Sequence, residues 1–219
     1  MRRKIALVAV ISLVLLAGCS GLTTYDAPPA ETDSDLAEEY NYNMTSQEEL
    51  KFEDNVTIAG YTQDIRMSSW ITLYEKDISD ELRLENDTQS PIVYATVNTP
   101  SINVSGQEFN PLSQQPTDEV VTFLSNETDE NVEIHDKVDE FNTTHTYTEK
   151  NMTVSKYEAT FTVNEIGAEF RGYVLVSIVE LDDSIVLMFG SYPEAYQEEE
   201  DNITELMKHT QSVEENSEE

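Results

Sequence analysis

Cys19 is the residue best placed to do chemistry, and it is the only cysteine in the chain. It follows Leu16, Ala17 and Gly18 at the end of an apolar run, which is the arrangement of a lipobox. In a lipobox the chain is cut before the cysteine, and the cysteine sulfur then carries a lipid. A thioether leaves no thiol for nucleophilic, redox or disulfide chemistry. The sequence therefore predicts lipidation at Cys19, with a membrane as the partner reached through the lipid.

The residues before Cys19 have the pattern of an export signal. Three basic residues, Arg2, Arg3 and Lys4, precede an apolar run from Ile5 to Leu16. That run is shorter than the roughly 20 residues that span a bilayer, so we expect residues 1–18 to be removed, with an uncleaved anchor helix as the alternative. The arginine pair also fits twin-arginine export, which leaves the export route open between Sec and twin-arginine. The predicted location is the outer face of the cell membrane.

No other group of residues has the spacing of a known reactive site. The three histidines, His135, His145 and His209, lack metal-ligand spacing, and no phosphate-binding or nucleophile motif is present. Carboxylates are so numerous that no catalytic pair stands out. We therefore predict a non-enzymatic domain with no cofactor and no metal. The alternative is a cell-surface hydrolase with a carboxylate-based site, which needs a pocket where a carboxylate or His135 has a shifted pKa.

The charge of the chain restricts its partners and its solvent. It has 44 acidic and 12 basic residues, with no cluster of Lys and Arg, so nucleic acid is excluded as a partner. So much negative charge repels itself in a compact state, but in molar salt the Debye length falls to about 3 Å and the repulsion is screened. The composition therefore predicts a halophile. A disordered acidic chain is the alternative, against which 38% of residues are hydrophobic.

Asn-x-Ser/Thr sequons are more frequent than the roughly two or three expected by chance. In an exported protein they indicate surface glycans, and in a polar halophile sequence they also arise freely. The predicted glycosylation sites are Asn43, Asn86, Asn126, Asn142, Asn151 and Asn202, while Asn55 and Asn103 lie within or beside predicted strands.

The chain divides into four parts by composition. Residues 1–18 are the signal, residues 19–45 an acidic tether around Pro28 and Pro29, residues 46–213 one domain, and residues 214–219 an acidic disordered tail. At the start of the domain, alternating apolar residues predict a β-hairpin over 50–74 that turns at Ala59–Gly60 and bends near Ser68–Ser69.

The rest of the domain reads as strands with two helices. The clearest strands are expected at 155–164, 170–181 and 184–189, the last two joined by a tight turn at Asp182–Asp183. Further strands are expected at 92–97 and 132–138, and helices at about 117–124 and 194–213. This order predicts an α+β fold, in which helices cover a twisted, mainly antiparallel sheet.

Two stretches carry residues typical of interfaces. One holds the only tryptophan, Trp70, with Tyr74, and the other is a Gly-Gln-Glu-Phe-Asn-Pro loop with Phe109 and Asn110. These four residues are the candidates for binding a partner, either another envelope protein or a small solute. The alternative is that Trp70 belongs to the core and that the loop is only a proline-locked turn.

The lipobox, Trp70 to Tyr74, the Gly106–Leu112 segment and the Phe189–Glu194 segment before an acidic helix occur together. Together they resemble a family of haloarchaeal exported lipoproteins of unknown function, over about residues 46–213. The strand–Gly-x-Tyr-Pro–helix ending also resembles PsbP-like α/β/α sandwich domains, which are accessory and binding modules. The resemblance implies binding rather than catalysis, by analogy of fold alone, and it supplies no catalytic residues.

Overall fold

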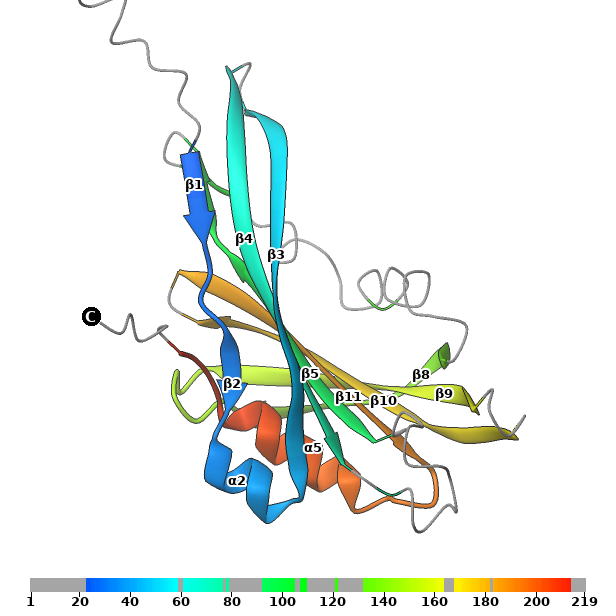
Figure 1. Ribbon diagram of the computed structural model, residues 1–219. Coiled ribbons are helices and arrows are strands. Elements are labelled where there is room, and N and C mark those ends of the chain that lie inside the picture. The colour runs from blue at the N-terminus through cyan, green and yellow to red at the C-terminus, as the bar shows by residue number, and fades with distance from the viewer. Residues whose placement is uncertain are drawn as a thin grey trace, which may run out of the picture.

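An eight-stranded sheet dominates the fold (Figure 1). The computed structural model describes residues 23–58, 61–76, 78, 92–104, 107–109, 121, 132–163, 168–181 and 183–213. The strands of the sheet are β1 (Thr23–Asp26), β3 (Tyr42–Ile58), β4 (Tyr61–Lys76), β5 (Val93–Pro100), β8 (Val132–Thr144), β9 (Asn151–Val163), β10 (Ala168–Leu181) and β11 (Ser184–Pro193). Their order is β1-β4-β5-β11-β10-β9-β8. β3 lies off this path and pairs with β4.

Most neighbouring strands of the sheet pair in the antiparallel direction. Each pair is antiparallel except β1 with β4, which is parallel. The predicted hairpin at the start of the domain is confirmed, since Ile58 pairs with Tyr61, and the tight turn is confirmed where Leu181 pairs with Ser184. The irregularity of the first hairpin, however, lies between Met44 and Ser46 rather than near Ser68–Ser69.

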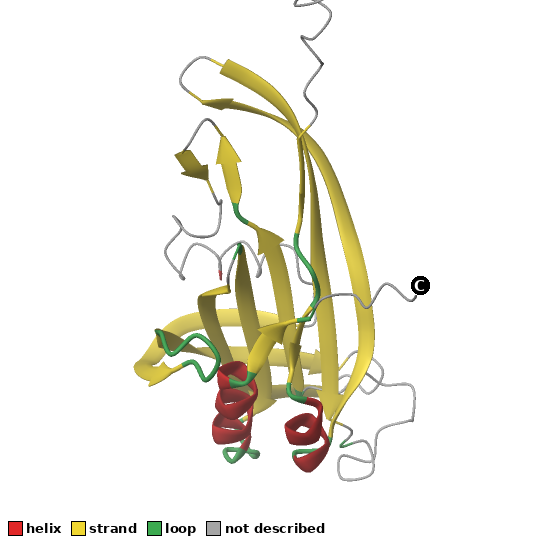
Figure 2. Cartoon of the chain, turned by 90° about the vertical axis from the view of Figure 1, so that its left-hand side faces the viewer, coloured by secondary structure: helices red, strands yellow, loops and turns green. Residues whose placement is uncertain are grey.

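The two faces of the sheet bury different clusters. One face packs against the two helices, α2 (Ser34–Glu39) and α5 (Glu199–Lys208), and we call it the helix-side face (Figure 2). Its core includes Tyr74, Tyr94, Met152, Val154, Leu175, Val186, Met188, Tyr192, Ile203, Leu206 and Met207. The opposite face buries Tyr157, Ala159, Phe161, Val174, Val176 and Leu187 with Val121.

Two pairs of short strands lie outside the eight-stranded sheet. β2 (Ala30–Thr32) pairs with β12 (Thr210–Ser212), which joins the two ends of the domain beside the helices. β6 (Ile102–Val104) pairs with β7 (Gln107–Phe109) as a separate small hairpin. The long β3–β4 hairpin extends beyond the rest of the sheet, away from α2 and α5 (Figure 1).

The predicted α+β sandwich with helices covering the sheet is wrong, because the fold is mostly β. The described residues contain two helices, of 6 and 10 residues, beside strands as long as 17 residues. The helix expected over 194–213 is α5 alone, since Thr210–Ser212 pairs with β2 as a strand. Of the helix expected at 117–124, only Val121 lies within the described residues, where it is helical and buried.

Residues 23–45 belong to the folded domain, so the tether predicted for 19–45 is wrong from Thr23 onward. Thr23–Asp26 pairs with β4, and Ala30–Thr32 pairs with β12. The Asp33 carboxylate caps α2 by accepting hydrogen bonds from the backbone N–H groups of Asp35 and Leu36. The acidic and proline-rich composition hid these elements, because each is too short to show a period of apolar residues.

Candidate functional site

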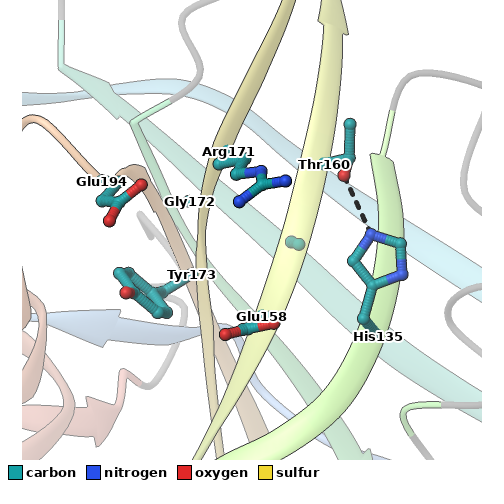
Figure 3. A pocket seen from close by; sticks show the side chains of 8 residues that line it. His135, Glu158, Thr160, Arg171, Gly172, Tyr173 and Glu194 are labelled. Carbon is teal, nitrogen blue, oxygen red and sulfur yellow. Dashed lines mark hydrogen bonds between the residues drawn. The ribbon is translucent and has the colours of Figure 1, made fainter.

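A polar groove lies on the helix-side face of the sheet, next to the start of α5 (Figure 3). Its volume is about 250 Å³, and it is open to solvent. It is lined by His135 from β8, by Glu158, Ala159 and Thr160 from β9, by Arg171, Gly172 and Tyr173 from β10, and by Glu194 just after β11. Residues of three strands and of the segment after β11 therefore meet at one place.

Strand register brings the polar side chains of the groove together. Thr160 pairs with Arg171, and Glu158 pairs with Tyr173, so these four side chains share one face. The backbone N–H of Glu194 donates to the carbonyl oxygen of Arg171 at 2.9 Å, which continues the ladder beyond β11. The β10 and β11 backbones thus fix Arg171 beside Glu194.

His135 enters the groove from a β-bulge. The register of β8 against β9 shifts between Ile134 and Lys137, which frees His135 from regular pairing. One ring nitrogen, Nε2, lies 2.9 Å from the Thr160 hydroxyl oxygen, as Figure 3 shows. The bulge therefore aims the imidazole at the groove rather than along the edge of the sheet.

One wall of the groove is held by α5. The Lys156 ammonium pairs with the Glu200 carboxylate, and its nitrogen lies 4.0 Å from the centre of the Tyr173 ring. The Tyr192 hydroxyl donates to Glu200 at 2.8 Å, and burial followed by this carboxylate raises the pKa of Tyr192, so the hydroxyl stays protonated. These contacts hold the Tyr173 ring against the sheet.

Arg171 differs from the other basic side chains of the described residues. The remaining Lys and Arg side chains in that part of the chain all form ion pairs, namely Lys51–Glu49, Arg66–Glu53, Lys76–Glu199, Lys137–Glu140, Lys150–Glu180, Lys156–Glu200 and Lys208–Glu205. Arg171 has no such pair there, although Glu158 and Glu194 line the same groove. Arg171 is exposed, so the hydrogen-bond donors of its guanidinium are accessible to solvent and to any molecule that enters the groove.

A family model described as "Domain of unknown function (DUF6517)" matches residues 29–211. The chain belongs to the DUF6517 family. No curated protein matches the chain, and no solved structure matches it. The DUF6517 match begins within the segment that folds as β1, β2 and α2, in agreement with a domain that starts well before residue 46.

Trp70 and Tyr74, two of the residues predicted to bind a partner, lie away from the groove of the DUF6517 domain. Trp70 and Tyr74 share the helix-side face of β4, which β5 and β11 separate from the groove strands. Trp70 is half-buried, but Tyr74 is 3% exposed, so it is a core residue with no surface to offer. Phe109 lies in β7, where its backbone pairs with that of Ile102 in β6, and Asn110 lies outside the described residues.

The predicted modification sites have varied surroundings in the DUF6517 domain. Asn43, Asn142 and Asn151 are exposed, and Asn151 donates to the Asn142 side-chain oxygen at 3.1 Å. Asn202 is half-buried and donates to Glu199 at 3.2 Å. Cys19, Asn86 and Asn126 lie outside the described residues.

The described part of the DUF6517 domain lacks two features, a membrane-spanning helix and a cluster of metal ligands. No helix there combines the length and the apolar character that crossing a membrane requires. Within the same residues, no three His, Cys, Asp or Glu side chains gather closely enough to hold a metal ion.

Sequence reasoning missed most of the groove. The alternation of residues in the strand predicted at 155–164 puts Glu158 and Thr160 on one face, and His135 is one of the groups that the hydrolase alternative names. The missing signal was the pairing of Thr160 with Arg171, which only the register of β9 against β10 supplies.

Proposed function

We propose that this protein is an exported lipoprotein, anchored through Cys19, whose DUF6517 domain binds a small polar solute without catalysing its reaction. One observation carries the proposal. In a chain with 44 acidic and 12 basic residues, the groove holds an arginine, Arg171, that no described carboxylate pairs with. In small-molecule sites, a small number of placed polar groups fixes the orientation of the ligand, and Arg171 is such a group in this groove.

The anchor is supported by the signal and lipobox of residues 1–19. Between Cys19 and the first residue of β1, Thr23, lie Ser20, Gly21 and Leu22. At about 3.3 Å per residue, this stretch spans only about 10–15 Å, so an anchored domain stays close to the membrane. β1 pairs with β4 beside the projecting β3–β4 hairpin, and β8, β9 and β10 lie below β1 in Figure 1, toward α5.

Mass spectrometry of the native protein tests the anchor. The expected N-terminus is Cys19 carrying a lipid, and a Cys19→Ser variant is expected to appear in the medium instead of the membrane fraction. A native chain that begins at Met1, or one with an unmodified thiol, would contradict the anchor.

Thermal unfolding with a library of small solutes tests binding. Because a ligand that binds only the folded state raises its stability, at least one sugar, polyol, amino acid or organic acid is expected to raise the Tm. The rise is expected to be lost in Arg171→Gln and kept in Arg66→Gln, whose side chain pairs with Glu53 on the β3–β4 hairpin. If no solute raises the Tm, or if Arg171→Gln responds like the wild type, solute binding in the groove is ruled out.

A hydrolase remains the second candidate, because Glu158, Glu194 and His135 line the same groove. Carboxylates beside an imidazole are groups that general acid–base catalysis uses. Incubation with oligosaccharides and peptides, followed by product analysis, decides between the two. Turnover that Glu158→Gln abolishes favours the hydrolase, whereas solute binding without turnover favours the binding module.

A further inference from the structure

The charges of the groove restrict the solute more narrowly than its polarity does. Two carboxylates, Glu158 and Glu194, line it with one guanidinium, that of Arg171. No carboxylate oxygen of the described residues lies within 4.0 Å of the Arg171 nitrogens, so the opposite charges line one cavity without forming an ion pair. Such an arrangement offers both an anion site and a cation site.

An anion and a cation would each meet a charge of the same sign in this groove. A plain anion is repelled by the Glu158 and Glu194 carboxylates that line the groove. A plain cation is repelled by Arg171. A neutral sugar gains little from separated charges of both signs, whereas a molecule that carries both charges meets a partner for each.

We propose that the groove binds a small dipolar ion that carries a carboxylate and an ammonium group, as a free α-amino acid does. The carboxylate pairs with Arg171, whose planar guanidinium matches a carboxylate through two parallel hydrogen bonds. The ammonium is held by Glu158 and Glu194. This inference rests on the proposed function, because it names the class of solute for the same groove.

The size and the walls of the groove agree with this class of ligand. Its volume of about 250 Å³ lies just below the range of about 300–1,000 Å³ that holds drug-sized ligands, so a molecule of amino-acid size fits. The Thr160 hydroxyl, next to Arg171 in the register, and the Tyr173 ring border the cavity. Lys156 already occupies a position over the Tyr173 ring, which fixes that wall before a ligand enters.

Calorimetric titration of the full mature chain in about 2 M KCl tests the inference. The probes are the common L-α-amino acids, and then, for the tightest of them, the analogue without its amino group and the analogue without its carboxylate. The amino acid is expected to bind at least about tenfold more tightly than either analogue. Tenfold corresponds to about 1.4 kcal/mol, a modest value for a charged contact.

Matched variants assign the two charges to their partners. Arg171→Gln is expected to weaken the binding of the amino acid by about tenfold or more. It is not expected to weaken the binding of the analogue without a carboxylate, because that analogue has no group that pairs with Arg171. Glu158→Gln is expected to weaken the binding of the amino acid but not the binding of the analogue without an amino group. The control variant Arg66→Gln, on the β3–β4 hairpin, is expected to bind the amino acid like the wild type. Circular dichroism is used to check that each variant is folded.

Three results overturn the inference. These are no binding by any amino acid, equal binding of an amino acid and its singly charged analogues, and unchanged binding in Arg171→Gln. If instead a neutral sugar or polyol binds and Arg171→Gln abolishes its binding, the dipolar ligand is wrong but the proposed solute-binding function stands.

Discussion

Gly172 in β10 lines the groove at a point where no side chain fits. A Cβ atom there would lie 2.2 Å from the carbonyl oxygen of Tyr192 and 2.8 Å from the Cα of Pro193, both backbone atoms of β11. Those atoms cannot move without separating β10 from β11, because Gly172 and Pro193 are paired. The identity of this residue is therefore set by the close approach of two strands.

Gly172→Ala is expected to lower the free energy of unfolding by about 1–3 kcal/mol, the usual effect of overpacking. Urea unfolding measures the change. The control is Glu169→Ala on the same strand, whose exposed side chain is expected to change stability by less than about 0.5 kcal/mol. Equal stability of Gly172→Ala and the wild type would show that β10 and β11 are less tightly packed than described.

His145 is fully buried in its neutral form. Its Nε2 donates to the carbonyl oxygen of Thr210 at 2.9 Å, and its Nδ1 accepts from the backbone N–H of Thr148 at 3.3 Å. Burial lowers the pKa of His145 below its ordinary value of about 6.5. The neighbouring His209 lowers this pKa further, whereas the hydrogen bond to Thr210 opposes the shift.

Stability is expected to fall as the pH drops below about 6.5, because His145 then binds a proton more readily in the unfolded chain than in the folded chain. Above that pH both states are neutral at this residue, and its titration has no effect. Urea unfolding between pH 7.5 and 5.5 should show a larger loss in the wild type than in His145→Gln. His135→Gln, a change at an exposed histidine, is the control and should follow the wild type. Parallel curves for wild type and His145→Gln would contradict the account.

At the scale of elements, α5 is fastened to the sheet by two adjacent acids of its first turn. Glu200 reaches Lys156 and Tyr192 at the groove, while Glu199, only 1% exposed, reaches the other side of the helix. Glu199 pairs with Lys76 and accepts from the Tyr42 hydroxyl at 2.9 Å. Burial, followed by the Glu199 carboxylate, raises the pKa of Tyr42, which keeps that hydroxyl a donor.

Glu199→Ala is expected to cost about 3–5 kcal/mol of stability, because it removes one partner of a buried ion pair. The neighbouring Glu198→Ala removes an exposed acid that makes no capping hydrogen bond, and its effect is expected to stay below about 0.5 kcal/mol. Thermal unfolding of the two variants measures the difference. A similar Tm for both would mean that the Glu199 contacts do not hold α5 in place.

Elements were predictable from the sequence where apolar residues alternate over many positions. This holds for β9, β10 and β11, with the turn before Ser184. Prediction from the sequence fails for β1, β2 and α2, which have only 4, 3 and 6 residues, most of them polar. The positions of β1 and β2 depend on distant partners in β4 and β12. The groove was not predictable either, since it depends on a strand register and a bulge rather than on a sequence motif.

At the scale of the whole molecule, the prediction of an α+β sandwich failed because helices were expected to form a layer. The described domain instead curves a long sheet over two short helices at one end (Figure 2). Strands such as β8 expose most of their polar residues, so their sequence carries too few apolar residues to indicate 13 residues of strand.

The net charge of −32 predicts that salt stabilises the domain. Raising KCl from about 0.1 M to about 1 M shortens the Debye length from about 10 Å to about 3 Å and screens the repulsion between carboxylates. The Tm is therefore expected to rise with KCl. The rise should be smaller when the exposed residues Glu38, Glu39, Glu169 and Glu198 are replaced by Gln. A Tm independent of KCl would contradict a halophilic origin.

A crystal structure of the mature chain, grown with the solute that raises its Tm most, tests the central claim most directly. The account predicts density for that solute in the groove of β8, β9 and β10, with an acceptor group against the guanidinium of Arg171 and contact to Glu158. An empty groove at a saturating concentration, or density for the solute at another surface such as that around Trp70, would contradict it.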